Sequence, residues 1–347
     1  MTNATLDFKY EDVLARFNTS LQKKIAHSVS LLRKAERLAM AYDSEDGYFL
    51  AFSGGKDSQC LYHVAKLVGV KFRAHMNLTS VDPPEVIRFV KKQYPDVELI
   101  KPKDSIFNIA VKKKILPTMR VRWCCEEYKE TAGAGKVTLI GIRKAESSRR
   151  AKRNEVEINN HSFSGDLIGL EAYRKEKTEK NKRRKRDPEK KQVTIVNANG
   201  ERTLGCIHGK ESLLISPIIH WTDADVWTFL NTLNITHCEL YDQGHARIGC
   251  ILCPMSQVKQ KYKEMERWPH VKRNWIKAIK AIQNGRLFKK EYIWWTNRKD
   301  WLHLKLTEEQ KNEIAENIFD WWISGKSYKQ WYAEKFCQLK LDFKDKE

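Results

Sequence analysis

The sequence predicts an α/β fold with a parallel central sheet, a helical segment before the sheet and a helical extension after it. Short apolar runs that favour strands, at 48–52, 72–78, 97–100 and 137–142, are separated by helical stretches such as 84–93. Strands that alternate with helices pair in parallel, because each return to the same edge of the sheet needs a crossover. In such sheets, ligands bind at the carboxyl ends of the strands.

Length and composition indicate a globular protein. The chain has 347 residues, of which 41% are apolar and 31% are charged, enough for one sizeable core with appendages or for two modest domains. No apolar run is long enough to cross a bilayer, and residues 1–11 lack the apolar stretch of a secretion signal. We therefore expect a cytoplasmic protein, in which eight cysteines serve metal binding or burial rather than disulfides.

The stretch before the first strand is expected to form one long amphipathic helix. Apolar residues recur there at steps of three and four: Leu14, Phe17, Leu21, Ile25, Val29 and Leu32. This spacing places them on one helix face between residues 11 and 41. The expected domains are 1–45 for this segment, 46–260 for the sheet domain and 261–347 for a helical extension that holds eight of the eleven tryptophans.

A glycine-rich turn follows the first strand and leads into a helix. The turn consists of Ser53, Gly54, Gly55, Lys56, Asp57 and Ser58. Two glycines let the backbone approach an anion, while the hydroxyls, the lysine and the free N–H groups of the helix start can bind its oxygens. Asp57 would repel a phosphate unless a cation lies between them, which suggests Mg²⁺ on a pyrophosphate. The lysine follows the glycines too closely for a Walker loop.

Two arginines follow the strand at 137–142. Arg143 and Arg150 are expected at the ligand-binding end of the sheet, where guanidinium groups suit phosphate or sulfate oxygens. The alternative is that both are ordinary surface arginines.

Four cysteines form two pairs that are far apart in the sequence. Cys124 and Cys125 are adjacent, and Cys250 and Cys253 form a C-x-x-C followed by proline. Two such pairs can close a four-sulfur metal site. Adjacent cysteines suit a large iron–sulfur cluster better than a small tetrahedral zinc ion, so a cluster is favoured, followed by zinc and then by a redox disulfide. The other cysteines in the sheet domain are expected to be buried thiols: Cys60, Cys206 and Cys238.

These motifs resemble a known family. The turn SGGKDS looks like the signature of the PP-loop ATP pyrophosphatases, and three later segments resemble the phosphoadenosine phosphosulfate (PAPS) reductase branch of that group: GIRKAESSRR, SPIIHWTDADVWTFL and LYDQGHARIGCILCP. They occur in the family's order between about residues 45 and 260. The resemblance implies an adenine-nucleotide α-hydrolase fold, and the adenylyl-sulfate reductase type implies a [4Fe-4S] cluster on the four paired cysteines. It extends the expected nucleotide-binding residues from the turn to Gly141, Arg143 and Ser147.

The sequence departs from the reductases of this family in two places. Those enzymes attack sulfur with a cysteine in a C-terminal Glu-Cys-Gly-x-His motif, but Cys337 is followed by neither glycine nor histidine. They have also lost the full SGG-x-DS turn, which is intact here. Both departures favour an enzyme that uses ATP, in which an acceptor oxygen attacks the α-phosphorus and expels pyrophosphate. The expected catalytic residues are Lys56, Asp57, Arg143 and Arg150.

Positive charge indicates a polyanionic partner. The formal charge is +20, and residues 174–191 hold eleven lysines and arginines against four acids, inside a basic insertion at 165–192 that lacks an apolar period. We expect this insertion to be a mobile excursion or a frayed helix. DNA or RNA is the expected partner, with a solvated basic surface as the alternative. In the tail, Trp294, Trp295 and Trp301 alternate with cations, but core packing is the favoured interpretation.

Three functions remain open from the sequence. The first is an ATP-dependent adenylating sulfurtransferase that acts on nucleic acid, similar to the DNA phosphorothioation proteins and served by a sulfur donor such as a cysteine desulfurase. The second is a thiol-dependent reductase of adenylyl sulfate or its 3′-phosphorylated form, which would use Cys337 and produce sulfite. The third is a nucleotide-sensing module without turnover. The sequence does not indicate an oligomeric state.

Overall fold

The computed structural model describes residues 1–130, 132–183, 194–196, 202–204, 211–282, 307–327 and 329–335. The chain divides into two compact units. The first unit comprises Met1–Leu78, Pro84–Lys101 and Glu127–Ile248. The second comprises Thr79–Pro83, Pro102–Glu126 and Gly249–Glu347. Each unit is therefore assembled from stretches that are separated in the sequence.

The N-terminal segment is helical, but the prediction of one continuous helix was wrong. The structure has η1 (Asn3–Thr5), α1 (Tyr10–Leu14) and α2 (Thr19–Tyr42). The break arises because Asn18 adopts an extended backbone and its side chain accepts a hydrogen bond from Leu21 N at 3.0 Å, which caps α2. Asparagine competes with helix hydrogen bonding in this way, so a cap interrupts the apolar period.

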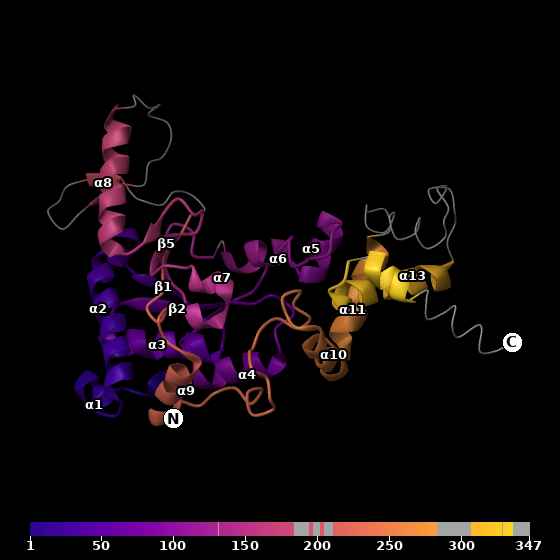
Figure 1. Cartoon of the computed structure of the whole chain (residues 1–347), viewed down its shortest axis with the longest axis horizontal. Coiled ribbons are helices and arrows are strands. Elements are labelled where there is room, and N and C mark those ends of the chain that lie inside the picture. The colour runs from indigo at the N-terminus through magenta and orange to yellow at the C-terminus, as the bar shows by residue number, and fades with distance from the viewer. Residues whose placement is uncertain are drawn as a thin grey trace. The chain divides into compact units, whose positions relative to one another are not determined.

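The central sheet carries the predicted strands in parallel. They are β1 (Tyr48–Ala51), β2 (Phe72–Asn77), β3 (Glu98–Ile100) and β4 (Val137–Leu139), and β1 lies between β2 and β4. The crossovers contain α3 (Lys56–Val68) and α4 (Pro84–Gln93). α2 and α3 pack together, and α3 also packs on α9 (Asp223–Thr232) (Figure 1). The predicted α/β class is confirmed.

One side of the sheet is antiparallel, which the sequence analysis did not predict. β9 (Leu213–Ile215) pairs in parallel with β4, but β5 (Val156–Ile158) runs antiparallel to β9, and β6 (Ser164–Gly165) pairs with β5. The sheet is therefore mixed rather than purely parallel. These strands have two or three residues each, too short for an alternating pattern to stand out.

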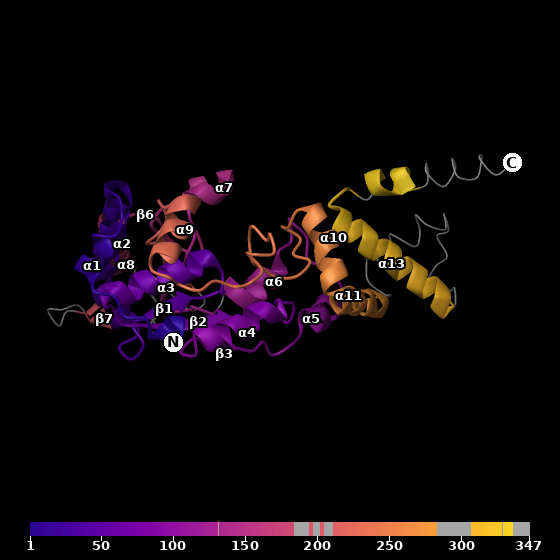
Figure 2. The same cartoon turned by 90° about the horizontal axis from the view of Figure 1, so that it is seen from below.

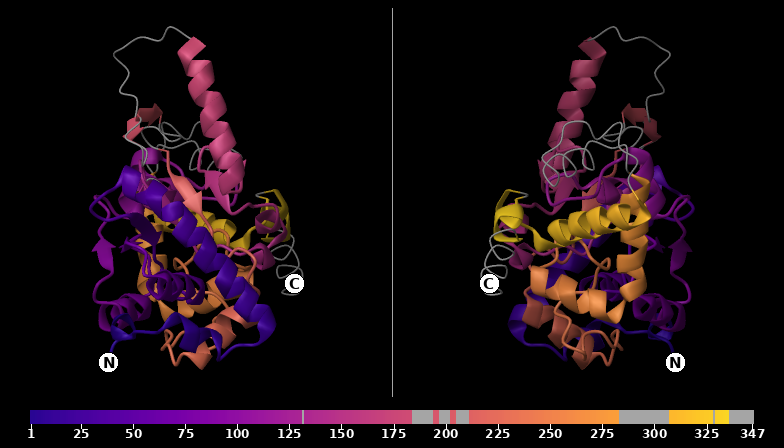
Figure 3. Two further views of the ribbon diagram at one scale, coloured as in Figure 1. Left: turned by 90° about the vertical axis from the view of Figure 1, so that its left-hand side faces the viewer. Right: turned by 90° about the vertical axis from the view of Figure 1, so that its right-hand side faces the viewer.

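The basic insertion is helical over most of its described length. α8 (Leu167–Arg183) stands out from the sheet of the first unit (Figure 3), and residues 184–192 lie outside the described part of the chain. After it, β7 (Thr194–Val196) and β8 (Arg202–Leu204) pair antiparallel, as expected for a hairpin. The Asn199-Gly200 turn expected between them is not among the described residues.

The second unit is helical. Its described helices are α5 (Ile106–Lys113), α6 (Trp123–Cys125), α10 (Val258–Arg267), α11 (Pro269–Ala281) and α13 (Glu308–Ser324). α11 packs against α5, α10 and α13 (Figure 2). Trp275 is 1% exposed and lies against Phe107 and Trp322. The described tryptophans of this unit thus include core residues, whereas the structure does not describe Trp294, Trp295, Trp301 or Cys337.

Three short helical turns complete the fold: η2 (Glu126–Glu130), η3 (Lys144–Glu146) and α7 (Ser148–Ala151). Among the described residues, no helix combines the length and the apolar character that a bilayer crossing requires.

Candidate functional site

The glycine-rich turn is tightly packed and held by its own serines. Gly55 caps the N-terminus of α3, and Ser58 Oγ donates a hydrogen bond to Gly55 O at 2.8 Å while it accepts one from Ser53 N at 3.2 Å. Gly54 has φ +70°, and a β-carbon there would lie 2.7 Å from Val86 Cγ1 and 2.9 Å from Val90 Cγ2 of α4. Only glycine fits this position, so the turn approaches α4 closely and presents its N–H groups at the helix start.

We expect Gly54→Ala to destabilise the protein more than Gly69→Ala. Both glycines have positive φ, but a β-carbon at Gly69 would meet nothing within 4 Å. The two substitutions therefore share the left-handed backbone cost, and only Gly54→Ala adds the overlap with the valines, worth about 1–3 kcal/mol. The measurement is the free energy of unfolding in urea. Equal losses for the two variants would contradict the packing described for Gly54.

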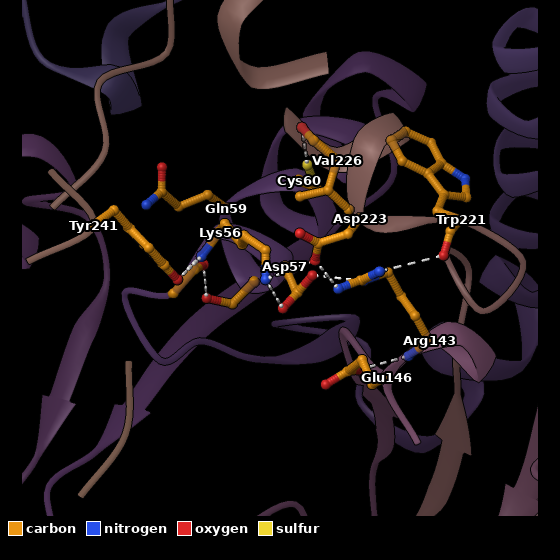
Figure 4. Close-up of polar contacts among 12 residues, drawn as sticks. Lys56, Asp57, Gln59, Cys60, Arg143, Glu146, Trp221, Asp223, Val226 and Tyr241 are labelled. Atoms are coloured by element: carbon orange, nitrogen blue, oxygen red, sulfur yellow. Dashed lines mark hydrogen bonds and ion pairs between the residues drawn. The ribbon is translucent and has the colours of Figure 1, made fainter. Parts of the chain in front are cut away.

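Two cations and two carboxylates form a network beside the turn (Figure 4). Arg143 donates from Nε to Asp57 Oδ1 at 2.6 Å and from Nη2 to Asp223 Oδ1 at 2.9 Å. Lys56 Nζ lies 3.1 Å from Asp223 Oδ1 and 3.5 Å from Asp57 Oδ2. Burial by itself would raise the pKa of Asp223, but the hydrogen bonds and charges of Lys56 and Arg143 lower it below its ordinary value. The four charges thus neutralise one another.

The burial of the network is uneven. Lys56 and Arg143 are 5% and 2% exposed, whereas the side chain of Asp223 is 64% exposed. The two cations are therefore fixed, and the partner nearest to solvent is a carboxylate. An anion that approached from solvent would compete with Asp223 for both cations.

The segment after β4 brings Arg143 to the turn. A β-carbon on Gly141 would lie 3.0 Å from Asp57 O and 3.3 Å from Ser58 N, so the segment passes directly over the turn's backbone. Lys144 N then donates to Ile219 O at 2.8 Å, which holds the segment in place. From the sequence, Arg143 was expected at the ligand-binding end of the sheet. In the structure, its guanidinium group is hydrogen-bonded to Asp57.

Arg150 and Ser147 lie further along the same segment. Ser147 Oγ accepts from Arg150 N at 3.2 Å and so caps α7, and the Arg150 guanidinium pairs with Glu146. Neither residue has a hydrogen bond or ion pair with the turn in the part of the chain that the structure describes. Their roles in nucleotide binding stay predictions.

Two residues that contact the turn, Tyr241 and Asp223, were not predicted from the sequence. Tyr241 Oη accepts a hydrogen bond from Lys56 N at 2.9 Å, and burial raises the pKa of this tyrosine. Its ring packs edge-on against Trp227 of α9. Both missed residues lie in segments that carry the family resemblance, but nothing in their local sequence indicates that they contact residues 53–58.

Cys60 is a buried thiol, as expected. Its sulfur lies 3.5 Å from Val226 O (Figure 4), and burial raises its pKa well above the ordinary value. Cys238 is also buried, and burial again raises its pKa. Neither has the character of a reactive thiolate.

The second unit contains all four paired cysteines, and none of them is in a disulfide. A hydrogen bond to Cys125 and burial raise the pKa of Cys124 above its ordinary value. The charges of Cys250 and Cys253 raise the pKa of Cys124 further. A metal cation would relieve this mutual repulsion, because thiolates are the form that binds metal.

Hydrogen-bond donors and a buried cation surround these sulfurs. Arg122 Nη2 lies 3.1 Å from Cys125 Sγ, and Thr79 Oγ1 lies 3.4 Å from Cys250 Sγ. Lys261 is 3% exposed; burial lowers its pKa, and the charge of Cys253 opposes that shift. Donors of this kind stabilise metal-bound thiolates, which suits a thiolate-held metal centre at these cysteines.

The C-x-x-C turn is strained and is held by a buried glutamate. Leu252, between the two cysteines, has φ +56°, which costs a non-glycine residue about 1–2 kcal/mol. Its N–H donates to Glu264 Oε2 at 2.7 Å, and burial raises the pKa of Glu264. Glu264 therefore positions the turn that directs Cys250 and Cys253.

We expect Glu264→Ala to weaken metal retention. Removal of the carboxylate leaves Leu252 N buried without its acceptor, at a cost of about 1–3 kcal/mol. Metal loss to a chelator should then be faster by roughly tenfold. Glu266→Ala is the matched control, since Glu266 is exposed on the same helix. Identical rates of loss in the two variants would remove Glu264 from this role.

The sequence of this chain is similar to those of several known proteins. Residues 47–256 match the family of phosphoadenosine phosphosulfate reductase domains. An uncharacterized protein of Methanocaldococcus jannaschii is 25% identical over 283 residues, which cover 79% of this chain and 57% of that protein. The adenosine 5′-phosphosulfate reductase of Lysinibacillus sphaericus is 23% identical over 182 residues, which cover 51% of this chain and 65% of that enzyme. The chain thus spans less than two thirds of the length of either relative.

The similarity of this chain to solved structures is low. Candida glabrata FMN adenylyltransferase aligns with a TM-score of 0.39 and 15% identity, over 70% of this chain and 67% of that one.

The family match runs from the residue before β1 to just beyond the second cysteine pair, and it covers more than half of the chain. It contains the glycine-rich turn, the segment of Arg143 and all four paired cysteines. The chain belongs to the phosphoadenosine phosphosulfate reductase domain family.

Proposed function

We propose that the chain is an ATP-dependent adenylating sulfurtransferase. In the first step an acceptor oxygen attacks the α-phosphorus of ATP, and pyrophosphate leaves. In the second step a sulfur donor at the sulfide oxidation state attacks the adenylated acceptor, and AMP leaves with the acceptor's oxygen. No net oxidation or reduction is then needed. The observation that carries the proposal is the complete turn at 53–58 with its four-charge network.

The network accounts for how a triphosphate would bind. The β- and γ-phosphates would replace Asp223 on Lys56 and Arg143, since that carboxylate is the exposed partner. The displaced carboxylate of Asp223, together with the nearby carboxylate of Asp57, would then be available to Mg²⁺, which usually binds through one or two carboxylates together with substrate phosphates. When bound, Mg²⁺ would neutralise charge on the leaving pyrophosphate.

The fixed cations would provide most of the rate enhancement. Lys56 and Arg143 are buried and already oriented by hydrogen bonds, so they need not reorganise as negative charge develops on the leaving group. N–H groups at the start of α3 would add further donors, apart from that of Lys56, which donates to Tyr241. Arg150 and Ser147 belong to this proposal as groups that could reach the nucleotide from the segment after Arg143.

We assign a [4Fe-4S] cluster to Cys124, Cys125, Cys250 and Cys253. Adjacent cysteines within the short helix α6 suit a large centre better than a single zinc ion. When bound, the cluster would supply iron that can hold sulfide. Arg122, Thr79 and Lys261 would stabilise its thiolates through hydrogen bonding and charge.

The proposed acceptor is nucleic acid, and α8 is the expected binding surface. Its described side chains include Arg174, Lys175 and Lys177, in a helix without a broad apolar face.

The double variant Lys175→Glu/Lys177→Glu should weaken DNA binding. The slope of the logarithm of the binding constant against the logarithm of the salt concentration should become shallower by roughly 0.9 for each phosphate that the variant no longer neutralises. Lys91→Glu/Lys92→Glu on α4 is the control. An unchanged salt slope in the α8 variant would show that α8 is only a solvated basic helix.

A reductase is the second candidate, because the relative from Lysinibacillus sphaericus is named as an adenosine 5′-phosphosulfate reductase. This activity would break the S–O bond of adenylyl sulfate, with a cysteine thiolate as the attacking group and an external thiol as the final reductant. Cys337 is the candidate nucleophile from the sequence.

The deciding experiment measures products from the cluster-loaded full chain. With ATP, Mg²⁺ and DNA or RNA, we expect pyrophosphate and AMP, and Cys337→Ser should leave this activity unchanged. With adenylyl sulfate and a thiol, the reductase alternative predicts sulfite that disappears in Cys337→Ser. ATP binding without any product would indicate a sensing module. If no nucleic acid tested leads to pyrophosphate release from ATP, the sulfurtransferase proposal is overturned.

A further inference from the structure

Two histidines and a glutamate of the first unit lie close together, and the proposed function uses none of them. His27 Nε2 lies 2.7 Å from Glu155 Oε1, and His220 Nε2 lies 2.9 Å from the same oxygen. All three ligand atoms lie within 4.8 Å of one another. We infer that His27, Glu155 and His220 bind a divalent transition-metal ion, with Zn²⁺ as the best match.

Hydrogen bonds already hold together the chain segments that carry these three residues. Ser28, next to His27 on α2, donates from Oγ to Pro217 O at 2.6 Å and accepts from Trp221 Nε1 at 3.2 Å. Ser216 N donates to Glu155 O at 2.8 Å. Hydrogen bonds next to each ligand thus join α2, the residue before β5 and the segment after β9. A site whose chain segments are fixed before binding loses less conformational entropy when the ion enters.

The ligand types select the ion. Two imidazoles and one carboxylate suit zinc and similar transition metals, whereas Mg²⁺ and Ca²⁺ prefer oxygen ligands alone. Bonds of 2.0–2.2 Å to a tetrahedral Zn²⁺ put neighbouring ligand atoms about 3.3 Å apart. The two observed nitrogen–oxygen distances are within about 0.6 Å of that value, so rotamer adjustments suffice. The His side chains are 49% and 45% exposed, which gives an ion access from solvent.

Three protein ligands leave one coordination position for another group. A cavity of about 150 Å³ adjoins the site and is lined by both histidines together with Lys23, Lys24, Pro217 and Trp221. Lys24 is paired with Asp225 at 2.5 Å, so its charge is largely offset. Lys23 adds positive charge, which opposes the metal but favours an anionic fourth ligand such as hydroxide or a small carboxylate.

The bound ion would connect α2 to the segment that leads into the four-charge network. His220 directly precedes Trp221, whose carbonyl oxygen accepts from Arg143 Nη1 at 3.4 Å, and Asp223 follows two residues later. The ion would therefore act as a clip on this segment, and its effect should be measurable as stability, independently of any nucleotide chemistry.

The test is equilibrium dialysis of the full chain against Zn²⁺ at neutral pH, with bound zinc counted per chain. His27→Ala, His220→Ala and Glu155→Gln should each bind one zinc fewer than the unchanged protein, or bind it at least tenfold more weakly. Zinc taken up by the thiols is common to all variants and cancels. The matched control is His237→Ala, because His237 pairs with Asp242 at 2.8 Å in the same way.

Thermal unfolding provides a second readout. Zn²⁺ in excess should raise the unfolding midpoint of the unchanged protein and of His237→Ala, but not that of the three site variants. Because the histidines are half exposed, their replacement should not prevent folding, and Glu155→Gln preserves the side-chain shape. Equal zinc counts, affinities and midpoint shifts across all variants would mean that the three residues form only a hydrogen-bonded cluster.

Discussion

Lys56→Ala is expected to reduce the rate of pyrophosphate formation from ATP by about 10²–10³-fold. Lys56 is buried, lies at the first position of α3 and is held between Asp57 and Asp223, so its charge is oriented before a nucleotide arrives. Its loss removes a fixed cation from the position at which charge develops on the leaving group. The substitution also leaves two carboxylates with one guanidinium, which weakens binding of the triphosphate.

Lys66→Ala is the control for this variant. Lys66 lies on the same helix, but its Nζ donates to Ala4 O, away from the turn. The rate should be measured at saturating ATP and as kcat/KM, after circular dichroism has shown that both variants are folded. A Lys56→Ala enzyme that keeps the rate of the Lys66→Ala enzyme would exclude Lys56 from catalysis, while the proposed reaction itself would remain intact.

Cys253→Ser is expected to abolish the iron–sulfur centre. Protein reconstituted without oxygen should contain four iron atoms per chain and absorb near 400 nm, as thiolate-bound clusters do. One missing thiolate leaves an iron without its ligand, so iron content should fall by at least about tenfold. The same loss is expected for Cys124→Ser, because the structure brings both cysteine pairs into one unit.

Cys337→Ser is the control, since Cys337 is not among the four proposed ligands. Iron and sulfide analysis, together with the visible spectrum, is the measurement. Colourless protein that carries one zinc ion per chain would indicate a zinc site in place of the iron–sulfur cluster. Equal iron in Cys253→Ser and in the unchanged protein would remove this cysteine from the centre.

Local features of the fold were predictable from the sequence. β1, the turn at 53–58 and α3 follow from a short apolar run, two glycines and a helical period, all within about twenty neighbouring residues. The N-terminal helix was also expected, but its break was not, because the cap at Asn18 outweighs an apolar period that continues through Phe17. The antiparallel strands β5 and β6 are too short to have a pattern of their own.

The site was predictable only in part, because its contacts join distant stretches. Arg143 could be placed at a strand end, but its pairing with Asp57 and Asp223 depends on how three segments meet. Tyr241 reaches Lys56 across 185 residues of sequence separation, and nothing local marks it. The convergence of His27 on Glu155 spans 128 residues and has no sequence signal at all.

During synthesis, the second unit is completed later than the first unit. A ribosome completes every stretch of the first unit once Ile248 has been added, and at that stage only Cys124 and Cys125 of the four paired thiols have been made. The strands and the nucleotide turn can therefore fold while the nascent chain is still growing, since domains form as they emerge. Insertion of a metal centre must wait for Cys250, Cys253 and the helices that follow them. If the four cysteines hold a metal centre as proposed, maturation has a built-in order, with the nucleotide-binding framework first and the metal centre last.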